Sequence, residues 1–132
     1  MDISSFDDLL LAARAQPEPQ RLLFVFAGAE LPEDSTPEQR RAFEQGEGGA
    51  LVPLMCVDKR PEELPSFGAL VNEAGQFGHA WQLLFAAGLP LAHAVTSEAA
   101  EEPLQRMVES IRRGELGNFI PFDRQGLAVR LG

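Results

Sequence analysis

The sequence predicts a single α/β domain spanning residues 1–132, with a mixed, mostly parallel sheet of about five strands and helices packed on it. Apolar segments of strand length alternate along the chain with amphipathic helical segments. Such alternation is typical of parallel sheets, because a helix carries the chain back to the start of the next strand. The length of 132 residues suits one domain, and a hydrophobic content of 45% with 23% charged residues is typical of a globular protein.

The first expected element is a helix over residues 5–14. Ser5 and Asp8 have the spacing of a capping box, which satisfies the free N–H groups at a helix start. Apolar residues recur at intervals of three and four from Phe6 to Ala13, so they share one face of this helix. Two prolines shortly after the helix end it.

Three apolar segments are expected to form strands, at residues 22–27, 51–57 and 81–87. The first is apolar at successive positions, which is the pattern of a strand buried on both faces. The second contains Pro53, which cannot donate a hydrogen bond to a neighbouring strand. This part of the strand is therefore expected at a sheet edge, at a bulge or unpaired.

Further helices are expected at residues 36–45, 66–75 and 103–113. Thr36 is a strong helix start, because a proline follows it directly and a glutamine lies three residues on. The last helix is placed after residue 102, since Pro103 inside a regular helix would remove one hydrogen bond and clash with the preceding turn. The glycine-rich segment 46–49 lies between a helix and a strand, the reverse of a phosphate-binding loop, and predicts a turn.

Two stretches of the chain resemble each other, residues 21–57 and 80–122. Each contains an apolar strand, a Leu-Pro loop, a Pro-x-Gln-Arg helix, a Gly-Glu-x-Gly turn and a strand with a proline. We interpret them as duplicated β-α-β units related by a pseudo-two-fold axis, or as chance similarity in a chain rich in these residues. Segments 119–122 and 127–131 are expected to close the chain as a C-terminal hairpin.

Charge and cysteine content exclude several classes of protein. The 20 acidic and 11 basic residues give a formal net charge of −9, which disfavours binding to nucleic acid or to an anionic membrane. Cys56 is the one cysteine, so no intramolecular disulfide is possible. The acidic N-terminus lacks the positive region of a secretion signal, and the longest apolar run, 22–29, is too short to span a bilayer. These features predict a cytoplasmic protein. The ratio of ten arginines to one lysine favours a bacterial source with a GC-rich genome.

The candidate ligand-binding residues follow from the predicted parallel sheet. Open α/β sheets bind ligands at the carboxyl ends of their strands, and three parallel strands would bring their following loops to one rim. The polar residues expected on this rim are Glu30, Cys56, Asp58, Lys59, Arg60 and His93.

These residue types allow three kinds of site. Cys56 with His93 and Asp58 has the groups of a nucleophilic site, the basic loop 58–60 could bind a carboxylate or phosphate, and the histidine with the carboxylates could bind a metal. The simpler interpretation makes Cys56 a small core residue, the loop solvated and the histidines, His79 included, structural. No spacing is specific to a catalytic set or a metal, so no catalytic residue, metal or cofactor is predicted.

Several stretches together resemble a small family of uncharacterised bacterial proteins often labelled "ribonucleotide reductase subunit alpha". They are Ile-Ser-Ser-Phe-Asp-Asp-Leu-Leu at 3–10, the segments 22–32 and 53–59, and Phe-Asp-Arg-Gln-Gly at 122–126, so the resemblance covers nearly the whole chain. The labelled activity does not follow, because that large subunit uses at least three thiols and is several-fold longer. The segment Leu-Val-Pro-Leu at 51–54 is similar to the N-terminal domain of the enhancer-of-serine-sensitivity (SseB-like) proteins, which implies a fold and no function.

The sequence therefore predicts a non-catalytic binding or accessory module that acts through protein–protein contacts. The partner would be another protein or a second copy of the chain, since the strand with Pro53 and the terminal hairpin both offer edges for pairing. The alternative is a small-molecule-binding protein or weak enzyme with its site at the carboxyl ends of the strands.

Overall fold

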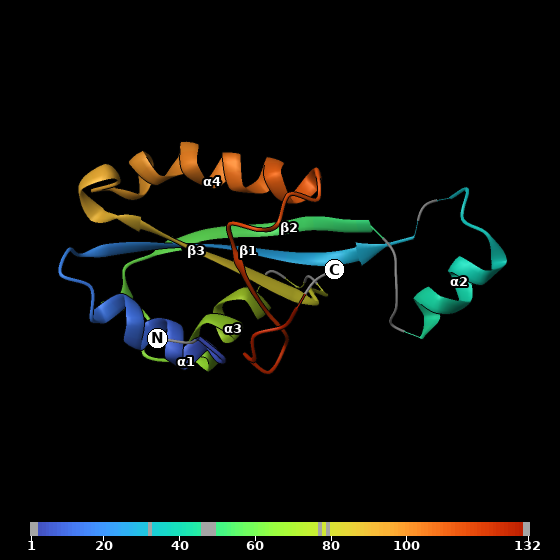
Figure 1. Cartoon of the computed structure of the whole chain (residues 1–132), viewed down its shortest axis with the longest axis horizontal. Coiled ribbons are helices and arrows are strands. Elements are labelled where there is room, and N and C mark those ends of the chain that lie inside the picture. Colours follow the sequence, from blue (N-terminus) through green and yellow to red (C-terminus); the bar gives the residue numbers. More distant parts are fainter. Residues whose placement is uncertain (1–2, 32, 46–49, 77, 79, 131–132) are drawn as a thin grey trace.

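The computed structural model describes residues 3–31, 33–45, 50–76, 78 and 80–130 and has three layers (Figure 1). A four-stranded sheet lies in the middle, with one helix on one face and two on the other. The predicted turn at 46–49, His79 and the last residue of the predicted hairpin lie outside the described residues. The elements are α1 (Phe6–Arg14), β1 (Gln20–Glu30), α2 (Pro37–Glu44), β2 (Ala50–Lys59), the 3-10 turn η1 (Pro61–Glu63), α3 (Phe67–Gly75), β3 (Leu83–Pro90), the 3-10 turn η2 (Leu91–His93), α4 (Ser97–Arg112) and β4 (Ile120–Phe122).

The sheet has the order β2-β1-β3-β4, and every neighbouring pair is antiparallel. The predicted mostly parallel sheet of about five strands is therefore wrong. Alternation of strands and helices gives no strand direction unless each helix crosses over the sheet. Helix α2 does not cross it, because α2 has no buried residue and lies beyond the end of β1 and β2, which pair as a long hairpin (Figure 1).

The central strand β1 is buried on both faces, as predicted from its apolar sequence. Leu22, Phe24 and Phe26 face α1 and α3, and the alternate residues of β1 face α4. The first face holds an aromatic cluster in which the ring of Phe6 lies 5.6 Å from Phe24, 5.2 Å from Phe67 and 5.6 Å from Phe122. β1 therefore contributes side chains to the hydrophobic core on both faces of the sheet.

Both predicted capping boxes are present, at Ser5 for α1 and at Thr36 for α2. Helix α4 is longer than predicted, because it begins at Ser97 behind an N-cap threonine and runs through Pro103. Its apolar stripe starts before the proline with Ala100 and continues beyond it, so burial against the sheet offsets the lost hydrogen bond. Within the described residues, no helix is both long and apolar enough to cross a membrane.

The C-terminal hairpin forms only in part. Strand β4 has three residues, and Leu127 and Ala128 make isolated bridges instead of a second strand. The two predicted repeat units each contain a pair of antiparallel neighbouring strands, β1 with β2 and β3 with β4. Their helices differ, because α4 packs on the sheet and α2 does not. The duplication stays a prediction.

Candidate functional site

The sheet does not form the shared rim predicted from the sequence. Glu30 pairs with Ala50 at one end of the β1–β2 hairpin, and Lys59 pairs with Leu22 at the other. Glu30 is eight residue steps from Leu22, which correspond to about 27 Å of strand. Since β1 is antiparallel to both its neighbours, its carboxyl end lies opposite theirs. The structure therefore separates Glu30 from the loop 58–60 and from His93.

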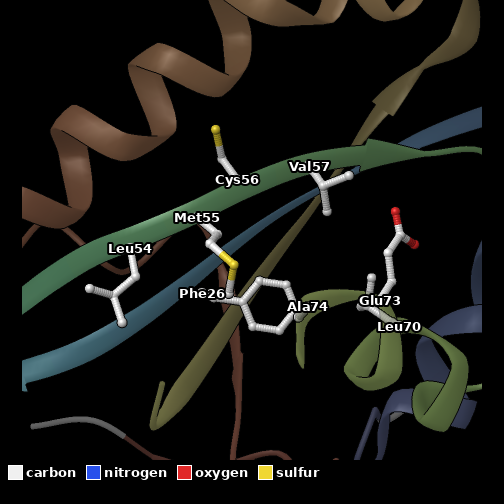
Figure 2. Close-up of a pocket in the computed structure, with 8 residues that line it drawn as sticks. All are labelled: Phe26, Leu54, Met55, Cys56, Val57, Leu70, Glu73 and Ala74. Atoms are coloured by element: carbon white, nitrogen blue, oxygen red, sulfur yellow. The ribbon is translucent and has the colours of Figure 1, made fainter. Parts of the chain in front are cut away.

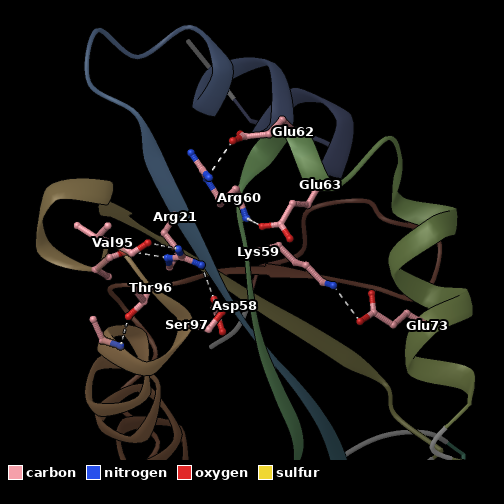
Figure 3. Close-up of polar contacts among 12 residues, drawn as sticks. Arg21, Asp58, Lys59, Arg60, Glu62, Glu63, Glu73, Val95, Thr96 and Ser97 are labelled. Carbon is pink, nitrogen blue, oxygen red and sulfur yellow. Dashed lines mark hydrogen bonds and ion pairs between the residues drawn. The ribbon is translucent and has the colours of Figure 1, made fainter.

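Asp58 forms an ion pair with Arg21 in which the Arg21 side chain is buried and the Asp58 side chain is partly buried (Figure 3). The Arg21 guanidinium also donates to the carbonyl oxygens of Ala94 at 2.7 Å and Val95 at 2.8 Å, and the Ser97 hydroxyl donates to Asp58 at 2.8 Å. These contacts join β1, β2 and the start of α4. The Asp58 carboxylate is engaged inside the fold, which argues for a structural role.

The other two charged residues of the predicted basic loop also contact acidic residues of the same chain. The Lys59 ammonium lies 2.9 Å from the Glu73 carboxylate of α3. The Arg60 guanidinium lies 3.0 Å from Glu62, while its backbone N–H donates to Glu63 (Figure 3). His93 is exposed on η2. Among the described residues, no group of histidine, cysteine and acidic side chains is placed to hold a metal ion.

Cys56 is exposed on β2, contrary to its interpretation as a core residue. Its side chain lies on the α4 side of the strand, opposite Met55 and Leu54 (Figure 2). Partial burial raises the pKa of the Cys56 thiol, and the charge of Asp58 raises that pKa further. A raised pKa keeps the thiol protonated at neutral pH, whereas a nucleophilic cysteine needs a lowered one.

The most unusual surface of the protein is the outer edge of β2. None of the residues 51–59 is buried, whereas β1 is buried at every position from Arg21 to Gly28. The half-exposed side chains of β2 are nevertheless mostly apolar, and they include Leu51, Val52, Leu54, Met55 and Val57. β2 ends the strand order, and no described strand pairs with its outer side. A long apolar edge of this kind is a template for pairing with another chain.

Hydrogen bonds of β1 show which backbone groups of β2 face outward. The N–H of Gln82 donates to Ala27, and the N–H of Leu91 donates to Pro19, both at 2.8 Å. The backbone N–H and C=O groups of odd-numbered residues in β1 therefore point to β3, and those of even-numbered residues point to β2. The two directions alternate along a strand of an antiparallel sheet. Cys56 and Asp58 are paired with odd-numbered residues of β1. Their own backbone N–H and C=O groups thus point to the outer edge.

Pro53 lies on the same outer edge, opposite Ala27. The register shifts between Phe26 and Ala27, which leaves Leu54 as the extra residue of a β-bulge. The prediction that Pro53 marks an edge or a bulge is confirmed, since both occur. The proline removes one outward donor, so the pairing-competent part of the edge is the segment from Leu54 to Lys59.

A groove flanks β2 on each face of the sheet. The groove on the α3 side has a volume of about 330 Å³ and an apolar lining of Leu54, Met55, Val57, Leu70 and Ala74, with Glu73 at its margin (Figure 2). The groove on the α4 side has a volume of about 230 Å³ and lies between residues 53–56 of β2 and Gln105, Val108 and Arg112 of α4. Side chains of an added strand would alternate between these two grooves.

Comparison of the chain with models of protein families, with curated proteins and with solved structures found no match. The candidate site therefore rests on the geometry of β2 alone. Sequence reasoning placed Leu54, Met55 and Val57 in a strand that offers an edge for pairing, but it did not name them as binding residues. Pro53 is the signal that locates this edge, because a proline inside an apolar strand indicates an edge or a bulge.

Proposed function

We propose that the protein is a non-catalytic binding or accessory module that acts through protein–protein contacts, with the outer edge of β2 as its binding surface. The observation that carries this proposal is an apolar strand of ten residues at the end of the sheet, with none of its residues 51–59 buried. Binding by strand addition uses backbone hydrogen bonds for affinity and side-chain grooves for specificity. The edge of β2 offers both.

Chemistry at the predicted rim draws no support from this geometry. Asp58 and Lys59 are paired with Arg21 and Glu73, and Glu30 lies at the far end of the hairpin. The thiol of Cys56 has a raised pKa, and His93 follows β3, which is separated from β2 by β1. A binding function needs none of these groups to react.

The proposal places the protein in the cytoplasm, with a protein partner and neither nucleic acid nor membrane. The net charge of −9 supports the exclusion of nucleic acid, because a phosphate backbone is bound through a basic face. The single cysteine is consistent with a reducing compartment. An unpartnered apolar edge also favours a protein partner over a small solute, since exposed apolar patches mark interaction sites.

Peptide display on the immobilised protein tests this function directly. We expect selected peptides to carry apolar residues at alternate positions, because every second side chain of an added strand would enter the groove beside α3. The protein is immobilised sparsely, so that its edges stay free. The edge variant Cys56→Lys is expected to lose binding, because a lysine at an exposed edge opposes strand pairing.

The matched control is Leu11→Lys, which also replaces an exposed apolar residue, on α1, where the side chain of Leu11 is 59% exposed. Leu11→Lys should bind the selected peptides as the wild-type protein does. Selection of no peptides, or equal loss of binding in both variants, would contradict the proposed function.

A further inference from the structure

We propose that the chain that occupies the β2 edge is a second copy of this protein, paired antiparallel about a two-fold axis perpendicular to the sheet near Cys56. This inference rests on the proposed function and names the partner of the same site. Such pairing joins two four-stranded sheets into one continuous sheet. It covers the β2 edge of each copy, as a two-fold interface does. It also places α3 beside α3 and α4 beside α4 of the two copies.

The chemistry of β2 matches the grooves that it lines. The groove beside α3 is apolar, and the side chains that β2 itself directs to that side are Leu54, Met55 and Val57. On the opposite side, the smaller groove beside α4 faces the small side chain of Cys56. A second β2 would therefore bring large apolar side chains to the larger groove and a small one to the smaller groove.

Electrostatic repulsion between the two edges is low despite the net charge of −9 on each chain. β2 carries two charged residues, and each is neutralised within its own chain. Asp58 pairs with Arg21, and Lys59 pairs with Glu73. Two copies of β2 can approach without bringing an unpaired charge into the interface, which is the arrangement that avoids a desolvation cost.

The charges of α4 are complementary to a second, antiparallel α4. Gln105 and Arg112 line the groove beside β2, and helical spacing puts Glu98 and Glu101 on the same side of the helix, nearer its N-terminus. This side is acidic at one end and basic at the other. A two-fold axis reverses the second helix, so Glu98 and Glu101 of each copy oppose Arg112 of the other.

The pairing that Arg112 makes in the single chain is weak enough to be exchanged. Its guanidinium lies 3.1 Å from Glu109 of the same helix, and both side chains are more than half exposed, at 60% and 52%. Exposed pairs of this kind contribute little to stability. Arg112 can therefore turn to the acidic end of a second α4 at small cost.

A charge swap on α4 tests the proposed dimer, with mass measured by light scattering and sedimentation over a range of concentrations. The wild-type protein should reach twice its 14.4 kDa. The single variants Glu101→Arg and Arg112→Glu should each dimerise at least about tenfold more weakly, because each turns attractive contacts into repulsive ones. The double variant Glu101→Arg/Arg112→Glu should recover the dimer, and a mixture of the two single variants should form a heterodimer.

Arg106→Glu is the matched control, because Arg106 is turned by about 100° around α4 from Gln105 and forms an exposed ion pair with Glu102 of the same helix. It makes the same charge change and should leave dimerisation unaltered. All three sites are exposed, so the variants are expected to fold, which circular dichroism checks. A short bismaleimide should also join Cys56 to Cys56 of a second copy in the wild-type protein, and this product should disappear on dilution to the monomer.

The outcomes separate this inference from the proposed function. A protein that stays monomeric at its highest soluble concentration, or a dimer unaffected by both Cys56→Lys and the charge swap, would overturn the inference. A monomer that still binds displayed peptides at β2 overturns the dimer alone and leaves the proposed function standing. A monomer that binds no peptide contradicts both.

Discussion

Replacing Asp58 by alanine is expected to lower the free energy of unfolding by about 3 kcal/mol. The side chains of Arg21 and Asp58 are 5% and 12% exposed, so this substitution leaves a guanidinium buried without its counter-charge. Breaking a buried pair by removing one partner costs roughly 3–5 kcal/mol, and the slight exposure of Asp58 puts the expected loss at the lower end. Asp58→Asn keeps an acceptor for Arg21 and Ser97, so its loss should be about half as large.

Urea unfolding followed by circular dichroism measures this loss. With a denaturant slope of about 1.5 kcal/mol per molar for a domain of this size, the midpoint should fall by about 2 M in Asp58→Ala. Thermal unfolding should shift down by roughly 12 °C. Both changes follow from the loss of one ion pair that joins β1 to β2.

The matched control is Glu62→Ala, because the ion pair of Glu62 with Arg60 is exposed at 63% and 46%. Its effect should stay within about 0.5 kcal/mol. A double-mutant cycle with Arg21→Ala and Asp58→Ala should give a coupling energy of at least about 1 kcal/mol. Equal stability of Asp58→Ala and Glu62→Ala would refute a structural role for Asp58 and return it to the candidate binding residues.

Further predictions concern the core, the α2 insertion, acid stability and the thiol. Phe6→Ala should cost about 3–5 kcal/mol in urea unfolding, because Phe6 is 1% exposed and contacts three aromatic rings. Replacing residues 31–49 by an Asn-Gly turn should lower the helical circular dichroism signal only by the contribution of α2 itself and change stability by no more than about 1 kcal/mol, since α2 has no buried residue. Hydrogen bonds from Ser4 and Ser5 lower the pKa of Asp8, so its stabilisation is present above the unfolded carboxyl pKa and lost as the pH falls through the folded one. Asp8→Asn should therefore be less stable than the wild-type protein near neutral pH, with the difference vanishing in acid unfolding titrations. Cys56 of the dilute native protein should react with iodoacetamide, with a rate that rises at higher pH than for a free cysteine, because its pKa is raised.

Local features of the fold could be predicted from the sequence, because they depend on neighbouring residues. The capping boxes at Ser5 and Thr36, the two-sided burial of β1 and the edge position of Pro53 all follow from short patterns. Strand direction could not be predicted, because it depends on whether a helix crosses the sheet. Helix α2 has the same start signals as a packed helix, and only its lack of buried residues shows that it does not cross.

The predicted rim shared by the candidate site residues was wrong for the same reason. Glu30 and Lys59 would share a rim only if β1 and β2 were parallel, and the antiparallel pairing puts them at opposite ends. The start of α4 was predicted too far along the chain, at Pro103. Burial of Ala100 and Leu104 against the sheet outweighs the local cost of a proline inside the helix. What the sequence did indicate was an edge strand at Pro53, and that strand carries the proposed function.

Amide hydrogen exchange along β2, measured by NMR on the dilute protein and again with its edge occupied, tests that function most directly. Met55 and Val57 face β1, so their amides should be protected in both states. The amides of Cys56 and Asp58 face outward and should gain protection only when a selected peptide or a second copy is bound. Binding that leaves the exchange of Cys56 and Asp58 unchanged would contradict β2 as the binding surface.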